Sequence, residues 1–368
     1  MRAATAGAVI FGVAHGAVGV AVPLLALRAG YSATEVGVLT ATSAIAQLIV
    51  RLGLGWVMRR WADWLLVAGS GLLLGLAGLI LALSAALVPF VTAQLLLGAS
   101  RACFFTGSQT HVVHGSGRTA RALARINLAA AAGMLVGPVM AGALSEVTPV
   151  LAVAVAGLIG AAVAVPASLL DRLPPFTRPH DRPPGQLWRR PGVRTACWAA
   201  ATGGAWYALL TSYVPVALDQ AGQSATAIGA LVAAANGATL VGTAAAGRAP
   251  VRWSLPTLAA GVVTAGVGAG ATAVVAGSVP LSALALAASG VAVGAGLVLA
   301  PALAAESVHP GERGDAIAVI GTFRSAALLA APLGVAGMVA VMPLALAVAL
   351  VGTAMALPAL SARRRQAP

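Results

Sequence analysis

The chain has 368 residues, of which 60% are hydrophobic and 8% are charged, and its mean hydropathy is +0.94. Soluble globular domains carry charge on about a quarter of their residues, so this composition excludes water as the main solvent of the protein. The 22 basic residues are all arginine and give a net charge of +13. Whether that charge faces nucleic acid or a membrane depends on where the arginines lie.

Apolar stretches of about 20 residues, the length that crosses a bilayer as a helix, recur along the whole chain. A signal peptide ahead of a soluble domain is therefore excluded. Bounded by Pro, Gly and charged residues, the stretches predict twelve transmembrane helices in two sets of six. The first set is 4–27, 35–57, 65–87, 90–112, 123–144 and 149–170, and the second is 195–218, 225–247, 255–277, 279–304, 315–340 and 343–361.

Residues 171–194 lie between the two sets, contain Pro and Arg throughout and have no apolar period. Such a composition is typical of a polar linker. The predicted domains are an N-terminal six-helix bundle at 1–170, this linker, and a C-terminal six-helix bundle at 195–368.

The arginines indicate the orientation of these helices. With a cytoplasmic N-terminus, only Arg28 falls on the outer side, whereas Arg51, Arg101 and Arg324 lie within spans and the remaining arginines face the cytoplasm. Cytoplasmic loops of membrane proteins are enriched in arginine, so we expect both termini and the linker on the cytoplasmic side of a bacterial inner membrane. The charge is then an orientation signal toward anionic lipid, and nucleic acid is not an expected partner.

Cys103 and Cys197 fall within apolar spans, which favours buried small side chains over a disulfide or a metal pair. We expect no metal and no cofactor, with a coupled proton as the one open question. The expected partners are the lipid bilayer and a small-molecule substrate, and the expected state is a monomer.

The chain contains an internal repeat. Residues 29–39, AGYSATEVGVL, and 221–231, AGQSATAIGAL, are identical at seven of eleven positions with an offset of 192. Chance similarity between Ala-rich segments does not also place Gly, Pro, Trp and Arg in one frame, so the chain is interpreted as two copies of a six-helix unit. The further matches are Pro23 with Pro215, Gly55 with Gly247, Arg60 with Arg252 and Trp61 with Trp253 at 192, His114 with His309 and Arg118 with Arg313 at 195, and Pro138 with Pro332 at 194.

Three local segments accompany the repeat: GWVMRRWADW from Gly55 to Trp64, GMLVGPVMAG from Gly133 to Gly142, and ESVHPGERGDA at 306–316. With two parallel halves and a cytoplasmic linker, the whole chain resembles the major facilitator superfamily, and the second segment resembles its exporters. The resemblance implies an all-α membrane protein with twelve transmembrane helices in two pseudo-symmetric six-helix bundles, of the bacterial drug or metabolite exporter kind.

The first segment departs from the superfamily's loop, which runs Gly, three residues, Asp-Arg, one residue, Gly-Arg-Arg. Gly55 and Arg60 fit that pattern. Arg59 stands at the Asp, Ala62 at the second Gly and Asp63 at the following Arg, so the motif is degenerate here.

Small and charged residues near helix ends form a candidate gate. The glycines of the fifth span and its proline allow close packing and a bend, and they are read either as packing or as a helix that rocks against its counterpart near Pro332. The charged residues are either solvated or paired across helices, and the repeat aligns His111 with Glu306, which would make a gate sensitive to pH. The candidate gating residues are Gly55, Arg59, Arg60, Asp63, His111, Arg118, Gly133, Gly137, Pro138, Arg252, Glu306 and Arg313.

Arg101 and Arg324 are predicted near the bilayer centre, because each lies about ten residues into its span and a helix rises 1.5 Å per residue. All nine acidic residues map to helix ends or loops. A guanidinium that faces lipid costs roughly 2.5 kcal/mol or more, so both side chains are expected to face a watery cavity, backbone carbonyls or an anionic substrate.

In the superfamily the first, fourth, seventh and tenth helices line the cavity. Arg101, Phe105, Ser108 and Gln109 share one face of the fourth span. The aromatic residues of the first and seventh spans either pack or line an apolar pocket for an amphipathic organic anion. The candidate substrate-binding residues are Arg101, Phe105, Gln109, His15, Phe11, Trp206, Tyr207 and Arg324.

The resemblance implies secondary active transport by alternating access. We expect export of a small amphipathic organic compound, an anion if the central arginines contact it, with proton antiport as one coupling and His15 as its candidate site. Uniport or import of a small organic anion stays open, and so does a membrane sensor that transports nothing. An embedded enzyme would need a motif such as Asp-x-x-Asp, which is absent. His111 and His114 lie at a helix exit, where no acidic partner is expected nearby, so we expect no enzyme.

Overall fold

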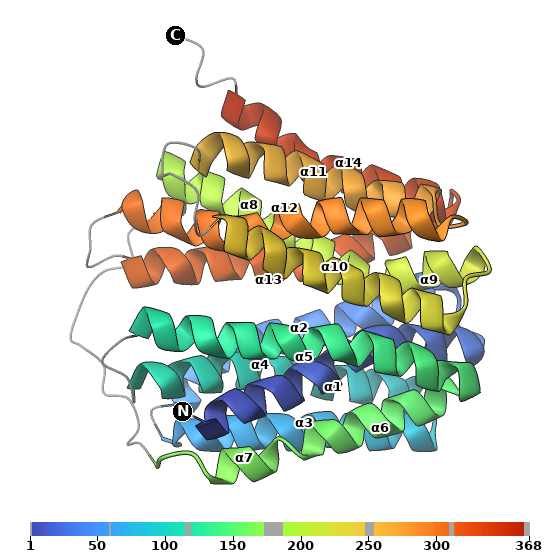
Figure 1. The fold of residues 1–368 in the computed structure, drawn as a ribbon, viewed down its shortest axis with the longest axis horizontal. Coiled ribbons are helices and arrows are strands. Elements are labelled where there is room, and N and C mark those ends of the chain that lie inside the picture. The colour runs from blue at the N-terminus through green and yellow to red at the C-terminus, as the bar shows by residue number, and fades with distance from the viewer. Residues whose placement is uncertain are drawn as a thin grey trace. The chain divides into compact units, whose positions relative to one another are not determined.

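A computed structural model describes residues 2–58, 60–114, 119–172, 187–246, 254–308 and 313–363. Every regular element in these ranges is helical. Figure 1 labels the helices in chain order. They are α1 Arg2–Arg28, α2 Ala33–Val57, α3 Asp63–Leu83, α4 Leu87–His114, α5 Thr119–Val147, α6 Pro149–Ala161, α7 Ala164–Ser168, the short 3₁₀ helix η1 Leu187–Arg189, α8 Pro191–Leu210, α9 Tyr213–Gln220, α10 Ala225–Ala246, α11 Ser254–Val274, α12 Val279–Glu306, α13 Arg313–Val339 and α14 Leu344–Arg363.

The chain forms two compact units. Unit 1 comprises residues 1–32, 39–180 and 224–233, and unit 2 comprises the remainder. In unit 1, α1 packs against α5 and α6, and α3 packs against α4 and α6. In unit 2, α11 packs against α12 and α14, and α8 packs against α12 and α13.

The helices confirm the predicted all-helical transmembrane fold. Ten helices of the described residues are long and apolar enough to cross a membrane, and Leu344–Leu357 is a shorter apolar helix. Most helix ends lie within a few residues of the predicted spans. Most of the predicted linker, at 173–186, lies outside the described residues, and the domain boundaries drawn from it stay a prediction.

Two predicted spans are not continuous helices. Residues 195–218 divide into α8 and α9 at Thr211 and Ser212, whose hydroxyls donate to the carbonyls of Tyr207 and Ala208 at 3.0 and 2.7 Å. Pro215 also lacks the N–H that the carbonyl of Thr211 would accept. The same proline in the first half, Pro23, lies inside an unbroken α1, where no hydroxyl residue stands at the two equivalent positions.

The other interrupted span is 149–170, which divides into α6 and α7 at Ala162 and Val163. Pro166 lies four residues after Ala162 and cannot donate to its carbonyl. Both interruptions thus share a proline one turn beyond the break, and the hydroxyl residues Thr211 and Ser212 occur only at the break between α8 and α9.

Glycines bring α1 and α5 into backbone contact. A Cβ atom at Gly133 would lie 2.2 Å from the carbonyl oxygen of Val9, and one at Gly137 would lie 2.2 Å from that of Val13. Pro138 lies against Gly16 in the same interface. Gly133 and Gly137 thus pack inside unit 1, and their predicted gating role is not tested by this contact.

The same turn ends the first membrane span of each half. Gly30 and Gly222, 192 positions apart, adopt positive φ angles of 89° and 80°. The amide of the residue after each glycine donates to a carbonyl five residues back, in the pattern of a Schellman helix end. The residue after each glycine also makes an equivalent side-chain hydrogen bond. Tyr31 donates to the carbonyl of Ala85, and Gln223 donates to the carbonyl of Ala276. The sequence repeat is therefore also a structural repeat.

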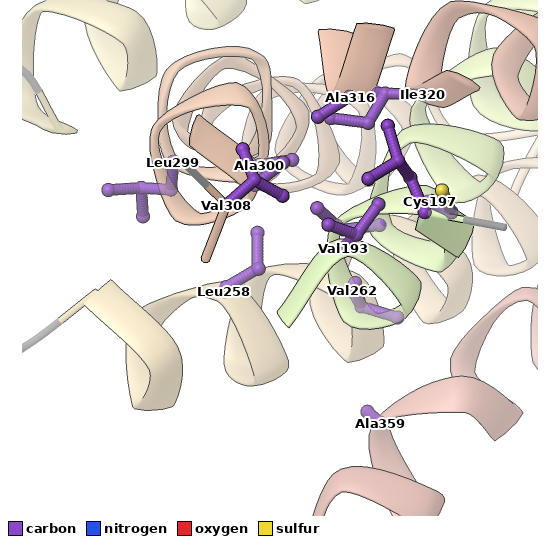
Figure 2. Close-up of a cluster of buried hydrophobic side chains, with 14 of the residues drawn as sticks. Val193, Cys197, Leu258, Val262, Leu299, Ala300, Val308, Ala316, Ile320 and Ala359 are labelled. Atoms are coloured by element: carbon purple, nitrogen blue, oxygen red, sulfur yellow. The ribbon is translucent and has the colours of Figure 1, made fainter. Parts of the chain in front are cut away.

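A buried hydrophobic cluster forms the centre of unit 2. It joins residues of η1, α8, α11, α12, α13 and α14. Figure 2 shows Val193 and Cys197 of α8 in this cluster with Val262 of α11 and Ile320 of α13. Both cysteines are free thiols, and Cys197 is buried whereas Cys103 is partly buried.

Gly133→Ala should destabilise unit 1, because the added methyl would overlap the backbone of α1. The expected cost is about 1–3 kcal/mol, measured as a lower midpoint of thermal unfolding of the purified protein by tryptophan fluorescence. Gly69→Ala in α3 is the matched control, since a Cβ there meets no atom within 4 Å. Equal midpoints for the two variants would contradict the backbone contact.

Candidate functional site

Arg101 lies on α4 and contacts a polar residue of α2. Its Nη2 atom donates to the hydroxyl of Ser43. The two helices approach closely here because Gly98 lies one turn before Arg101, and a Cβ atom at Gly98 would be 2.0 Å from the carbonyl oxygen of Ser43. Gly98 therefore allows the approach that lets a guanidinium of α4 reach a short side chain of α2.

Aromatic rings of α1 and α4 form a cluster beside this arginine. The rings of Phe11 and Phe104 stack with centroids 3.8 Å apart, and Phe105 meets Phe11 edge to face at 6.0 Å. His15 stacks on Phe11 at 5.7 Å and interacts electrostatically with Arg101. The predicted residues Phe11, His15, Arg101 and Phe105 are thus brought together within unit 1.

The polar part of this site extends along two helices. Ser108 on α4 and Gln47 on α2 are buried, and within the described part of the chain their Oγ and Oε1 atoms have no hydrogen-bond partner. Unsatisfied buried polar atoms are rare in proteins and need an explanation, such as water or a ligand. Gln109, the remaining predicted residue on α4, donates instead to Asn127 of α5 at 3.4 Å.

Sequence reasoning missed the contribution of α2. Ser43, Gln47 and Arg51 follow one another at intervals of four within an otherwise apolar helix, so they lie on one face. That spacing was the available signal, because a polar stripe on an apolar helix marks a face turned toward other polar groups.

The other three predicted binding residues lie in unit 2. Trp206 on α8 is buried at 2% exposure, and the neighbouring Tyr207 is partly buried. Arg324 on α13 is partly exposed, lines a cavity within unit 2 and interacts electrostatically with Tyr207. Five of the eight predicted binding residues therefore lie in unit 1 and three lie in unit 2.

Asp63 and His111 form a buried pair, which corrects the expectation that His111 has no acidic partner. Their exposures are 6% and 5%, and Nδ1 of His111 lies 3.1 Å from Oδ1 of Asp63. Asp63 begins α3 and His111 lies near the end of α4, and these antiparallel neighbours pack closely at Gly107. The two groups are therefore paired across helices and are not simply solvated charges.

The remaining gating candidates lie at or near the ends of helices, or outside the described residues. Arg60 and Glu306 are exposed. Gly55 lies in α2 and Arg313 begins α13, and their side chains are not described. Arg59, Arg118 and Arg252 lie outside the described residues.

The comparisons with known proteins agree on one family. The sequence profile of the Major Facilitator Superfamily matches residues 4–332. The chain belongs to the major facilitator superfamily. No curated protein matches it in sequence.

Solved structures of this superfamily share the fold. A bacterial homolog of the human lysosomal transporter Spinster, in an inward-facing and occupied conformation, has a TM-score of 0.75 and 14% identity, with 99% of this chain and 94% of that chain covered. A POT family transporter in complex with a thioalcohol-conjugated peptide has a TM-score of 0.73 and 10% identity over 98% and 95% of the chains. The POT family transporter PepTSo has the same TM-score, with 11% identity over 99% and 98%.

Membership of the superfamily makes this protein a membrane transporter and not an enzyme. Its substrate is therefore expected to be a small molecule that it carries across the bilayer. At identities of 15% or less, the solved structures establish the fold, while the site residues stand on the contacts given above.

A double-mutant cycle tests the Asp63–His111 pair. Asp63→Asn and His111→Gln should each lower stability, and the double variant should lose less than the sum, with a coupling of about 0.5–3 kcal/mol. The free energies come from thermal unfolding of purified protein. Asp63→Asn combined with the exposed Glu306→Gln is the control and should be additive. Additive effects within the buried pair would mean that the two side chains do not interact.

Proposed function

We propose that this transporter carries a small amphipathic organic anion by alternating access, in the direction of export. The observation that supports it is the grouping of Arg101 with Phe11, Phe105 and His15 within unit 1. A guanidinium supplies charge and hydrogen bonds to a carboxylate or sulfonate. The rings supply an apolar surface to the organic part of the same molecule.

The polar residues around Arg101 support a ligand that accepts and donates hydrogen bonds. Ser43 orients the guanidinium from α2, and the buried side chains of Gln47 and Ser108 carry unused hydrogen-bonding capacity. A neutral apolar substrate would leave these groups unsatisfied, at a cost of about 1–3 kcal/mol each. An anion with additional polar groups would use them.

The coupling of transport to protons is carried in this proposal by His15, which lies among rings and beside Arg101. Proton antiport requires that proton and substrate exclude each other. An anion bound at Arg101 would instead favour a protonated imidazole nearby, since opposite charges attract. The electrostatic interaction of His15 with Arg101 therefore favours a second candidate function, uptake of the anion together with a proton.

The proposal also includes the membrane, the orientation and the oligomeric state of the protein. The arginine distribution supports a bacterial inner membrane with both termini in the cytoplasm, and a monomer contains both halves that alternating access needs. A member of the POT family of similar fold holds a conjugated peptide, which supports an organic molecule of moderate size as the substrate class.

Arg101→Gln should reduce transport of organic anions by about tenfold to a hundredfold, because a charged hydrogen bond contributes about 1.5–3 kcal/mol. Accumulation in inverted membrane vesicles, measured for a panel of organic anions and lipophilic cations at two pH values, reads out both direction and charge selectivity. Arg28→Gln, at the exposed end of α1, is the matched control and should transport normally. Transport of cations that is unaffected by Arg101→Gln would refute an anionic substrate.

His15→Gln should remove the dependence of transport on a proton gradient while leaving exchange of substrate in place. In proteoliposomes with an imposed pH gradient, antiport drives the anion against the direction of proton flow, and co-transport drives it along. Proton dependence identical to that of the unmodified protein would exclude His15 as the coupling group, and an unresponsive unmodified protein would indicate uniport.

A further inference from the structure

The repeat aligns two stacked rings of unit 1 with two glycines of unit 2. At the offset of 192, Phe11 corresponds to Gly203 and Phe104 corresponds to Gly296. The Phe11 and Phe104 rings fill the space between α1 and α4. Their counterparts on α8 and α12 have no side chain to place there.

The surrounding backbone is packed alike in the two units, so this space is not lost through collapse. A Cβ atom at Gly98 would meet the carbonyl oxygen of Ser43, and one at Gly290 would meet that of Ala235, each 192 positions later. On the facing helices, a Cβ atom at Gly12 would lie 2.1 Å from the carbonyl oxygen of Ala130, and one at Gly204 would lie 2.3 Å from that of Arg324. The helix positions are kept while the rings are absent.

A cavity occupies that position in unit 2. It lies between α8, α11, α12 and α13, and both Gly203 and Gly296 line it. A Cβ atom at Gly296 would meet no atom within 4 Å, so the space beside it is open. Leu258, Val262, Ala300 and Ile320 form other parts of its wall and are labelled in Figure 2.

Arg324 gives this apolar cavity a positive charge. Arg324 aligns with Ala130 of unit 1 at the offset of 194. Unit 2 therefore has a guanidinium where unit 1 has a methyl group, beside the cavity that replaces the two phenylalanine rings. Among the described residues no carboxylate pairs with Arg324. The one other polar side chain in the lining is Thr202, whose hydroxyl is directed at the carbonyls of Met355 and Trp198, 3.1 and 3.2 Å away.

We propose that this cavity is a binding site for an aromatic monocarboxylate. The ring of the ligand occupies the space that phenylalanine rings fill in unit 1, and its carboxylate pairs with Arg324 through two parallel hydrogen bonds. One negative charge matches one guanidinium. A dianion would bring a second charge into apolar surroundings with no group to balance it.

Calorimetric titration of the purified full chain in nanodiscs with benzoate, benzamide and acetate tests this site. Benzoate should bind at least about tenfold more tightly than benzamide, which lacks the charge, and than acetate, which lacks the ring. Arg324→Gln should weaken benzoate binding by at least about tenfold. Gly296→Phe should abolish it, because the new ring fills the open space as Phe104 does in unit 1 while Arg324 is kept.

Two matched variants control for charge and bulk. Arg28→Gln removes an exposed arginine, and Gly337→Phe adds a ring at an exposed position of α13 where a Cβ meets no atom within 4 Å. Both should bind benzoate as the unmodified protein does. Unchanged affinity in Gly296→Phe, or equal binding of benzoate and benzamide, would overturn the proposal even if Arg324→Gln failed to fold.

This site is independent of the proposed direction and coupling of transport. Binding is measured without a gradient, so a failure of vesicle transport bears on the proposed function alone. Conversely, absence of benzoate binding refutes the unit 2 site and leaves the Arg101 site of unit 1 as it stands.

Discussion

Direct contact between helix backbones is the interaction on which the rest of this structure depends. In a bilayer, apolar side chains gain little by leaving lipid for protein, so helices are held together by close packing and by hydrogen bonds across their interfaces. Gly133 and Gly137 meet α1 in unit 1, and Gly204 meets α13 in unit 2. Gly98 and Gly290 do the same between α4 and α2 and between α12 and α10. One of these contacts places a functional group directly, because Arg101 reaches Ser43 where Gly98 stands one turn away.

The two units share a repeated backbone but differ in their interior side chains. The same helix ends occur at Gly30 and Gly222, each followed by a side chain that closes on the far end of the third helix of its half. The interiors differ. Unit 1 has stacked rings, a histidine and an arginine held by serine, whereas unit 2 has glycines, a tyrosine and an arginine with no carboxylate partner among the described residues. The two halves therefore keep the same helix packing while their interior side chains differ.

Much of the fold was predictable from the sequence. Hydropathy placed the helices, and identities in one frame gave the repeat, because both are properties of single segments or of pairs at a fixed offset. The breaks before α7 and α9 were not predicted, although the hydroxyls of Thr211 and Ser212 and the proline after them are local signals. The contact of Arg101 with Ser43 depends on the register of α2 against α4, which no sequence pattern specifies. The Asp63–His111 pair could have been predicted, because the predicted topology puts both residues at one end of neighbouring antiparallel helices.

The freedom around Gly296 has a consequence for how this protein can evolve. At Gly204, Gly290 and Gly294 a side chain would strike the backbone of a neighbouring helix, so those positions are closed to change. At Gly296 an added Cβ atom meets no atom within 4 Å, and the position lines the cavity. Single-codon replacements there would narrow, reshape or seal the cavity in small steps. Ligand selectivity in the second half could therefore drift under selection while the architecture of the first half stays unchanged.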